Sequence, residues 1–262
     1  MSAIGIVFRS GMSSKSDLAG AVAAGVPIGV VAGNLTTGAR FMTLPRHLDN
    51  GQPVFVDSGA FSEDSSDLPM DWEDILRRYD DIALMTRCPA NLYVVAPDCV
   101  GNQAETLRLL ATWSARIKAL INQGVNVIVP IQCGALPGQQ MIERVASILE
   151  TRQFLAGIPS ARAAMSIAEC QTLSHRAFHI LGRVQMNEEQ RDRVKALRFR
   201  NPGATVNADA NWLRSRLRKV IRLTEAERQR CLSDMPLTFD HPRTNAVAQA
   251  LREDCVWGAQ RP

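Results

Sequence analysis

The chain has 262 residues, of which 46% are hydrophobic and 21% charged, a composition that can build a large core and excludes a chain that is disordered throughout. The net charge of +4 permits a polyanionic partner but does not require one. The most apolar stretch, Leu18–Gly33, contains Pro27 and is too short to cross a bilayer, which excludes a helical membrane protein.

Six cysteines are scattered along the chain: Cys88, Cys99, Cys133, Cys170, Cys231 and Cys255. No two of them form a CxxC pair, and the first residues show no secretory leader. We therefore expect reduced thiols in a cytoplasmic protein, with neither a disulfide framework nor a structural zinc site.

Short apolar runs predict eight strands. They are Ile4–Phe8, Pro27–Val31, Val54–Asp57, Leu92–Ala96, Asn126–Ile131, Phe154–Gly157, Ala177–Leu181 and Ala204–Asn207. Amphipathic stretches between most of them predict helices over Met70–Thr86, Gln103–Gln123, Gly138–Thr151, Ala161–Ser174 and Asn187–Phe199. This alternation is typical of βαβ units, and eight repeats favour closure into a (β/α)8 TIM barrel; an open doubly wound sheet is the structural alternative. We interpret Leu18–Gly33 as barrel wall.

The pattern changes after the last predicted strand. Helices are expected over Asn211–Leu223, Thr224–Met235 and Thr244–Asp254. No linker, internal repeat or low-complexity segment is present. We therefore predict a catalytic barrel over residues 1–223 and a C-terminal helical extension, residues 224–262, packed on the barrel.

Polar residues follow four predicted strands at the same relative place. They are Asp57, Asp98, Gln132 and Asp209. Each alone is commonly a helix cap, but chemistry in a (β/α)8 barrel lies at the C-terminal ends of the strands. Four such residues, with Gly59, Gly134, Gly157 and Gly182 nearby, favour a ligand site, because glycines let a flat ligand approach the backbone.

The residue types at these strand ends restrict the chemistry. The four histidines fall mostly elsewhere, which disfavours a Ser-His-Asp hydrolase, and no GxGxxG or Walker motif follows a strand. Paired carboxylates suit chemistry at an anomeric carbon, where one attacks C1′ or stabilises an oxocarbenium-like state and another moves protons. Gln and Ser beside them can recognise the edge of a base.

Five segments lie at these strand ends: Asp57–Phe61, Pro97–Gly101, Pro130–Gly134, Leu155–Ser160 and His179–Gly182. Taken in order, they resemble the motifs of tRNA-guanine transglycosylases and their DNA-modifying relatives. The first, DSGAF, is similar to a DSGGF-type motif; the second, followed by Glu105-Thr106-Leu107, looks like the segment of the base-recognition aspartate; the third looks like a VQG segment. The last two resemble the glycine-bearing strand ends that follow. The resemblance extends from about residue 50 to residue 220.

The resemblance implies a role for each residue. Asp209 would attack C1′ and expel guanine, leaving a covalent glycosyl-aspartate, and Asp57 would deprotonate the incoming 7-deazaguanine. The base would be bound by Ser58, Phe61, Asp98, Gln132, Gly157, Leu181 and Gly182, with Phe61 and Leu181 against its two faces. Two displacements at one carbon predict retention of configuration and ping-pong kinetics, with no cofactor. For Asp209, the alternative is an N-cap of the helix expected from Asn211.

The chain departs from the tRNA enzymes in one respect. They carry a zinc site with a CxCxxC run and a downstream histidine, whereas Cys231, His241 and Cys255 are scattered here. The sequence also contains no appended RNA-binding domain. Both departures favour the DNA-acting relatives, often called DpdA, which insert 7-deazaguanines such as preQ0 into DNA. Exchange on tRNA is the nearest alternative.

A basic stretch surrounds Asp209. It contains Arg191, Arg193, Lys195, Arg198, Arg200, Arg214, Arg216, Arg218, Lys219 and Arg222. The same stretch contains two acidic residues, Asp192 and Asp209, so its net charge of +8 exceeds the +4 of the whole chain. We predict that it contacts the phosphates of DNA, with solvated helix faces as the alternative. A base within a duplex must also be flipped out before C1′ can react.

Two further classes of function compete with base exchange. If water resolved the glycosyl-aspartate, the protein would be a nucleosidase for a modified nucleoside, which the basic stretch disfavours. A non-catalytic barrel subunit would lack one of the aspartates, whereas both are present here. A second copy of this chain and an ATPase that opens the duplex are further candidate partners; no membrane partner is expected.

Overall fold

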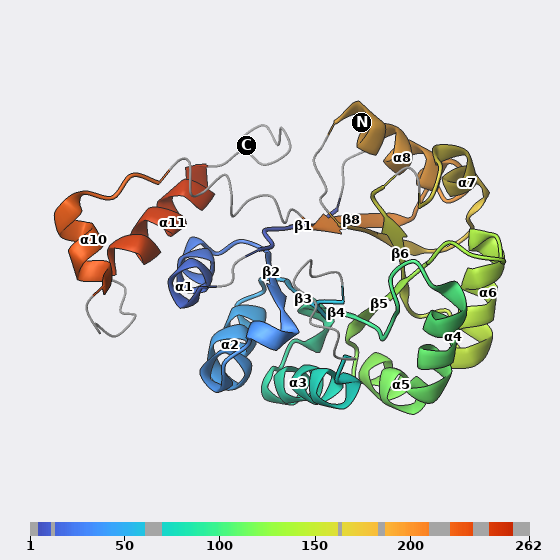
Figure 1. Ribbon diagram of the computed structural model, residues 1–262, viewed down its shortest axis with the longest axis horizontal. Helices are drawn as coiled ribbons and strands as arrows, with labels where there is room; N and C mark the ends of the chain where they lie inside the picture. Colours follow the sequence, from blue (N-terminus) through green and yellow to red (C-terminus); the bar gives the residue numbers. More distant parts are fainter. Residues whose placement is uncertain are drawn as a thin grey trace.

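The computed structural model describes residues 5–11, 14–60, 70–161, 164–182, 187–209, 221–232 and 241–253. Eight parallel strands form one sheet in the order β1-β8-β7-β6-β5-β4-β3-β2. They are β1 (Val7–Phe8), β2 (Ile28–Val31), β3 (Val54–Asp57), β4 (Leu92–Val95), β5 (Asn126–Pro130), β6 (Leu155–Pro159), β7 (Ala177–Leu181) and β8 (Thr205–Asp209). A parallel bridge between Arg9 and Ile28 joins the two ends of the sheet. The fold is the predicted (β/α)8 barrel (Figure 1).

The strand registers fix the stagger of this barrel. Followed once around from Asp209, through β1 and then each strand to β7, they return to β8 at Asn201, eight residues earlier. A shear of eight is that of a TIM barrel, in which alternate strands contribute inward-facing side chains in stacked layers. The registers therefore identify which residues share a layer.

The innermost aromatic layer closes the barrel. Phe8, Phe55, Ile128 and His179, from β1, β3, β5 and β7, form what we call the floor layer, and all four are fully buried or nearly so. The rings of Phe8 and Phe55 lie 5.6 Å apart, and His179 stacks on Phe55 at 4.9 Å. The interior is a packed core with no pore, so any site must lie above this layer.

Helices surround the strands (Figure 1). They are α1 (Lys15–Ala24), α2 (Leu44–Asp49), α3 (Trp72–Met85), α4 (Gln103–Thr112), α5 (Ser114–Asn122), α6 (Gly138–Leu149), α7 (Ile167–Thr172), α8 (Glu188–Phe199), α10 (Glu225–Leu232) and α11 (Pro242–Glu253), with short turns η1 (Ala32–Asn34), η2 (Ala39–Thr43) and η3 (Pro89–Asn91). The single helix predicted over Gln103–Gln123 is wrong, because the backbone leaves helical geometry at Trp113 (φ −100°, ψ 9°). Helix α7 is shorter than predicted because Ser166 caps it through the N–H of Glu169.

Helix α11, which follows the barrel in sequence, lies beside α1, and α10 lies next to α11 (Figure 1). Helix α11 packs against α1 so closely that a side chain on Gly20 would come within 2.6 Å of Val247 Cβ. Arg243 also donates to the buried carboxylate of Asp17 at 2.8 Å. The interpretation of Leu18–Gly33 as barrel wall throughout is therefore wrong, since its first part belongs to α1. Most of the helix predicted over Asn211–Leu223 lies outside the described residues.

Candidate active site

The two aspartates predicted to be catalytic end their strands and point inward. Asp57 is the last residue of β3, two residues after Phe55, and Asp209 is the last of β8. Because side chains alternate along a strand, Asp57 faces the same way as Phe55, and Asp209 lies opposite the inward-facing Phe8. Both carboxyl groups therefore lie above the floor layer, at the C-terminal mouth, where (β/α)8 barrels carry their sites.

Two layers of side chains stand between the floor layer and solvent. The lower one, from β2, β4, β6 and β8, contains Gly29, Val95, Gly157 and Asp209, and we call it the glycine layer. The upper one, from β1, β3, β5 and β7, contains Ser10, Asp57, Pro130 and Leu181. Two of the four positions of the glycine layer lack side chains, and Ser10 and Leu181 of the upper layer pack into the places that Gly29 and Gly157 leave.

Asp98 and Gln132 meet as the sequence predicted. Gln132 Nε2 donates to Asp98 Oδ2 at 2.9 Å, and Gln132 Oε1 accepts from the N–H of Gly101 at 3.0 Å. The side chain of Gln103 also donates to the carbonyl of Gln132 at 2.9 Å. With both ends of its amide bonded, Gln132 holds one oxygen of Asp98 in place. Asp98 does not cap the next helix, since Asn102 caps α4.

A turn orients the carboxyl group of Asp57. The N–H of Gly59 donates to Asp57 Oδ1 at 3.1 Å, and the N–H of Ser58 also bonds to this carboxyl group. Gly59 has a φ of 88°, and a side chain there would lie 2.9 Å from Val31, so this position requires glycine. Ser58 is buried at the same turn. Phe61, predicted to cover one face of the base, lies outside the described residues.

Asp209 combines burial with one unbonded oxygen. Its side chain is 4% exposed, the N–H of Gly182 bonds to its carboxyl group, and Oδ1 has no hydrogen-bond partner. Gly182 has a φ of 103°, which lets the chain turn at the end of β7 and present this N–H. An inward-facing strand residue is a better candidate for a site than for the helix cap that the sequence left open.

The three carboxyl groups influence one another. Burial, and after it the charge of Asp57, raises the pKa of Asp98 to about 7. The same two causes raise the pKa of Asp209 well above its usual value, and burial raises that of Asp57. Because like charges oppose each other's ionisation, the mouth holds protons on carboxyl groups near neutral pH. Such groups can donate and accept protons at that pH.

The other predicted base-binding residues also lie at this mouth. A side chain on Gly157 would come within 2.7 Å of Leu181 Cδ1, so Leu181 lies over the Gly157 backbone. Gly182 follows Leu181 at the end of β7. The described base-binding candidates therefore lie at the C-terminal end of the barrel, with Asp98 and Gln132 after β4 and β5 and with Leu181 and Asp209 on β7 and β8.

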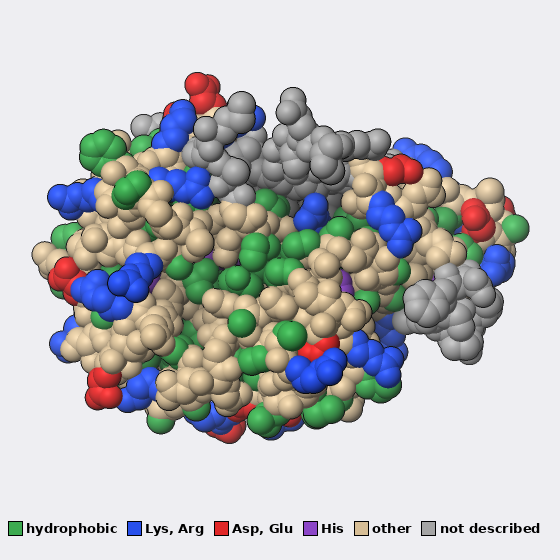
Figure 2. Space-filling view, turned by 180° about the vertical axis from the view of Figure 1, so that it is seen from behind, with side chains coloured by type: hydrophobic (Ala, Val, Ile, Leu, Met, Phe, Trp, Pro, Cys, Tyr) green, Lys and Arg blue, Asp and Glu red, His purple; other side chains and the backbone are tan. Residues whose placement is uncertain are grey.

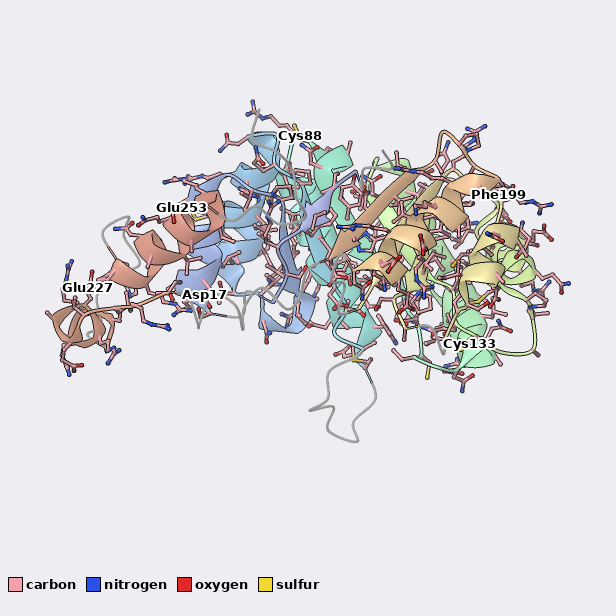
Figure 3. All side chains as sticks on the ribbon, turned by 90° about the horizontal axis from the view of Figure 1, so that it is seen from above. Asp17, Cys88, Cys133, Phe199, Glu227 and Glu253 are labelled. Carbon is pink, nitrogen blue, oxygen red and sulfur yellow. The ribbon has the colours of Figure 1, made fainter. Side chains whose placement is uncertain are left out.

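The basic residues of α8 do not surround this opening. Arg193 is fully buried and donates to the carbonyl of Met165 at 2.9 Å, so the prediction that it contacts phosphate is wrong. Helix α8 runs back toward the start of β8, where Arg198 bonds to the carbonyl of Ala204 at 3.4 Å and Arg200 to that of Thr172 at 3.3 Å. Figure 3 shows Phe199, between these two arginines, on the opposite side of the molecule from Cys133, which follows Gln132.

The prediction that Arg198 and Arg200 contact phosphate beside Asp209 is therefore also wrong, because a barrel helix ends at the far side from the strand ends. Figure 2 shows that far side, where hydrophobic side chains gather near the centre and Lys and Arg are scattered around them. Arg191 and Lys195 are exposed, and Lys195 pairs with Asp192 at 2.8 Å. Four further candidates, Arg214, Arg216, Arg218 and Lys219, lie outside the described residues.

Three histidines of the described segments serve the fold. His47 and His175 bond to the carbonyl groups of Val26 and Phe154 at 2.9 and 2.7 Å, and His179 belongs to the floor layer. Within the described residues, no three His, Cys, Asp or Glu side chains are grouped so that they could hold a metal ion. No described helix is long and apolar enough to cross a membrane.

Two mouth residues escaped the sequence analysis. Tyr79, on α3, is fully buried and donates to the carbonyl of Val95 at 3.1 Å; burial first, and then the charges of Asp57 and Asp98, raise the pKa of its hydroxyl. Ser10 follows β1 and joins the upper layer. Its place, two residues after a predicted strand, matches that of the other site residues and is the signal that could have revealed it.

Comparison with known proteins gives the fold and leaves the family open. No family model matches the sequence, and no curated protein matches it. A putative fructose-1,6-biphosphate aldolase from Coccidioides immitis superposes with a TM-score of 0.57 at 11% identity, covering 95% of this chain and 89% of that one. An L-ribulose 3-epimerase gives a TM-score of 0.45 at 12% identity, covering 95% and 93%. At such identities the likeness to the aldolase concerns the fold alone.

Proposed function

We propose that this chain is an enzyme that replaces guanine in DNA with a 7-deazaguanine such as preQ0, through a covalent glycosyl-aspartate intermediate. The observation that carries the proposal is the carboxyl group of Asp209, which is buried at the barrel mouth, bonded by the N–H of Gly182 and within reach of the charge of Asp57. A carboxylate so placed can attack an anomeric carbon.

The chemistry takes two displacements at C1′. In the first, one carboxylate oxygen of Asp209 bonds to C1′, the bond from C1′ to guanine N9 breaks, and the departing guanine takes a proton from the acid form of Asp57. In the second, Asp57 accepts a proton from N9 of the incoming 7-deazaguanine, N9 bonds to C1′, and the ester to Asp209 breaks. Each step inverts the carbon, so the product retains its configuration.

The raised pKa values fit these roles once substrate is included. Burial favours the neutral form of Asp209 in the free protein, whereas attack needs the carboxylate. Before attack, Asp209 gives up its proton to solvent, and the positive charge that develops at C1′ then stabilises the carboxylate. Asp57, whose pKa burial also raises, can hold the proton that the leaving guanine requires.

The other side of the mouth supplies the groups for a purine edge. Asp98 has one oxygen bonded to Gln132, which leaves the other for a ligand N–H. A carboxyl group with a pKa of about 7 can accept from a guanine edge as carboxylate or donate to it as acid. Leu181 offers an apolar surface for the face of the ring. These features support a base such as guanine, and they suit 7-deazaguanine equally.

The test is incorporation of labelled preQ0 or guanine into duplex DNA, single-stranded DNA and tRNA. Label should enter DNA with the wild-type chain, and both Asp57→Ala and Asp209→Ala should abolish it. Asp192→Asn, at a half-buried position of α8 where Asp192 pairs with Lys195, is the matched control and should be as active as wild type. Label in tRNA alone would keep the chemistry and change the substrate, whereas activity that survives in Asp209→Ala would exclude Asp209 as the nucleophile.

A nucleosidase that hydrolyses a modified nucleoside is the second candidate, and one observation favours it. The basic stretch was the evidence against a small free nucleoside, yet Arg193 is buried and Arg198 and Arg200 lie at the other end of the barrel. Release of free base from a nucleoside without any acceptor base would support hydrolysis. A fall in activity on DNA with rising salt would instead favour the polymer.

A further inference from the structure

We propose that Ser10 is a positioning residue whose hydroxyl group donates a hydrogen bond to Asp209 Oδ1 when this carboxyl group is ionised. The inference deepens the proposed function, in which Asp209 is the nucleophile. It concerns two side chains that are both at least nine-tenths buried and that both have an oxygen without a partner, Ser10 Oγ and Asp209 Oδ1. Two such atoms side by side in a barrel interior need a common explanation.

The registers bring these two residues together. Strands β1 and β8 are neighbours in the barrel (Figure 1), and Phe8 on β1 lies opposite Asp209 on β8. Ser10 is the next inward-facing residue after Phe8. Ser10 is thus a diagonal neighbour of Asp209 on two adjacent parallel strands about 4.8 Å apart, so two polar side chains that turn toward each other can meet.

The hydroxyl group of Ser10 occupies a place that a glycine leaves empty. It lies 1.9 Å from where a Cβ atom of Gly29 would be, so it fills the side-chain position of Gly29 in the glycine layer. Asp209 is the adjacent member of the same layer, across β1. With Asp209 neutral, the hydroxyl rests against the Gly29 backbone and bonds to nothing. Rotation about a single side-chain bond can turn it toward β8.

This rotation would bring a hydrogen-bond donor to the buried carboxylate of Asp209. A buried carboxylate without donors is costly, and each donor that bonds to the charged form lowers the pKa of the group. Asp209 has the N–H of Gly182 on one side, and its Oδ1 is unbonded. An O–H bonded to a carboxylate is a strong hydrogen bond, so Ser10 would stabilise the nucleophilic form selectively.

The other groups near Asp209 do not supply this stabilisation. Asp57, on β3, is a like charge and opposes ionisation. His179, on β7, is held neutral, because burial lowers the pKa of its ring to about 3. Tyr93, below the floor layer, bonds to Asn207. Arg9 faces outward from β1 and donates to the carbonyl of Val7 at 3.2 Å. Among the groups on the strands that flank Asp209, Ser10 is therefore the candidate side-chain donor for Oδ1.

The test measures the pKa of Asp209 directly, in the substrate-free protein, by carbon NMR with labelled aspartate carboxyl groups. The resonance is assigned by its loss in Asp209→Asn. Ser10→Ala should raise the pKa of Asp209 by about one unit, a tenfold change in its ionisation constant. A double variant, Ser10→Gly with Gly29→Ser, returns a hydroxyl to the same interior position from β2 and should restore the wild-type value.

The outcomes separate this inference from base exchange. A higher pKa in Ser10→Ala, reversed in the double variant, supports the inference even where no label enters DNA. An unchanged titration of Asp209 in Ser10→Ala, including a carboxyl group that stays protonated in both proteins, overturns it. Equal shifts in the single and double variants also overturn it, because they would reflect packing and not the hydroxyl group. Label incorporation by wild type tests the proposed function separately.

Discussion

The floor layer and the mouth of the barrel lie one above the other and bury polar groups in opposite ways. In the floor layer, His179 is fully buried between aromatic rings, neither ring nitrogen has a hydrogen-bond partner, and burial lowers the pKa of the ring to about 3. In the mouth, three carboxyl groups are coupled through the charge of Asp57, and burial raises their pKa values. Both layers favour neutral groups at neutral pH, but only the mouth adjoins the open strand ends.

The difference teaches that burial of a titratable group does not by itself mark a site. His179 is fully buried, and no charged group contributes to its pKa, so the low pKa reflects only the unfavourable free energy of burying a polar ring. The carboxyl groups interact with one another and lie at the C-terminal ends of the strands. Perturbed groups indicate function when they couple to each other at such a place.

The largest expected effect is on the rate of base incorporation, which depends on the mouth and not on the floor layer. Asp209→Asn keeps the shape of the side chain and removes the nucleophile, so incorporation of label should fall by at least about 10³-fold. The fold should persist, because the amide relieves a buried acid. Rates of base incorporation, measured beside circular dichroism, check both parts. A variant within tenfold of wild type would mean that Asp209 is outside the chemistry.

The floor layer should respond through stability. Phe55→Ala removes a fully buried ring that packs against Phe8 and His179, and such changes cost about 3–5 kcal/mol of unfolding free energy. Urea unfolding measures this loss. Leu84→Ala, on an exposed side chain of α3, is the control and should cost much less. A loss below about 1 kcal/mol for Phe55→Ala would contradict the view that this layer is a close-packed base.

The pH dependence of stability sharpens the comparison. Asp98 ionises with a pKa of about 7 in the folded protein and near its usual 3.8 when unfolded. The folded state therefore binds more protons between these values, so this group lowers stability as pH rises from about 4 to about 7. The free energy of unfolding of Asp98→Asn should exceed that of wild type by a few kcal/mol at pH 8 and should nearly equal it at pH 4.

The control for this comparison is Asp192→Asn, which removes only a surface pair with Lys195 on α8 and should stay within about 0.5 kcal/mol of wild type at both pH values. An advantage of Asp98→Asn that is the same at pH 4 and pH 8 would show that packing, and not ionisation, causes it. The amide can still accept the hydrogen bond from Gln132, so this interaction is retained.

The strands were predictable because their residues are buried on both faces. Parallel strands inside a barrel appear as short apolar runs, and β3 and β7 have the predicted bounds. Helix α1 was not recognised because α11 covers it, so its Ala- and Gly-rich sequence has no distinct polar face. That contact joins residues more than 200 positions apart, and no local pattern contains it.

The site was predictable to the extent that strand ends were. Asp57, Asp98, Gln132 and Asp209 could be found because a barrel gathers whatever follows its strands. The position of Ser10 in the site follows from its register with Gly29, which a single sequence does not give. Arg193 was misassigned because charge was counted along the chain, whereas a helix turns every third or fourth residue toward the core.

The smallest predicted effect is at His179, and its pH dependence has the opposite sign to that of the mouth. The ring titrates at about 3 when folded and near 6.5 when unfolded, so the unfolded chain binds more protons between these values and wild type loses stability as pH falls from 6.5. His179→Leu removes two unpartnered nitrogens and keeps a similar volume, at the loss of the stack on Phe55. We expect a gain of about 1 kcal/mol at pH 7 and a larger one at pH 5, measured by urea unfolding. A variant less stable than wild type at pH 5 would show that the ring has a partner in solution, and the floor layer would then belong to the functional site.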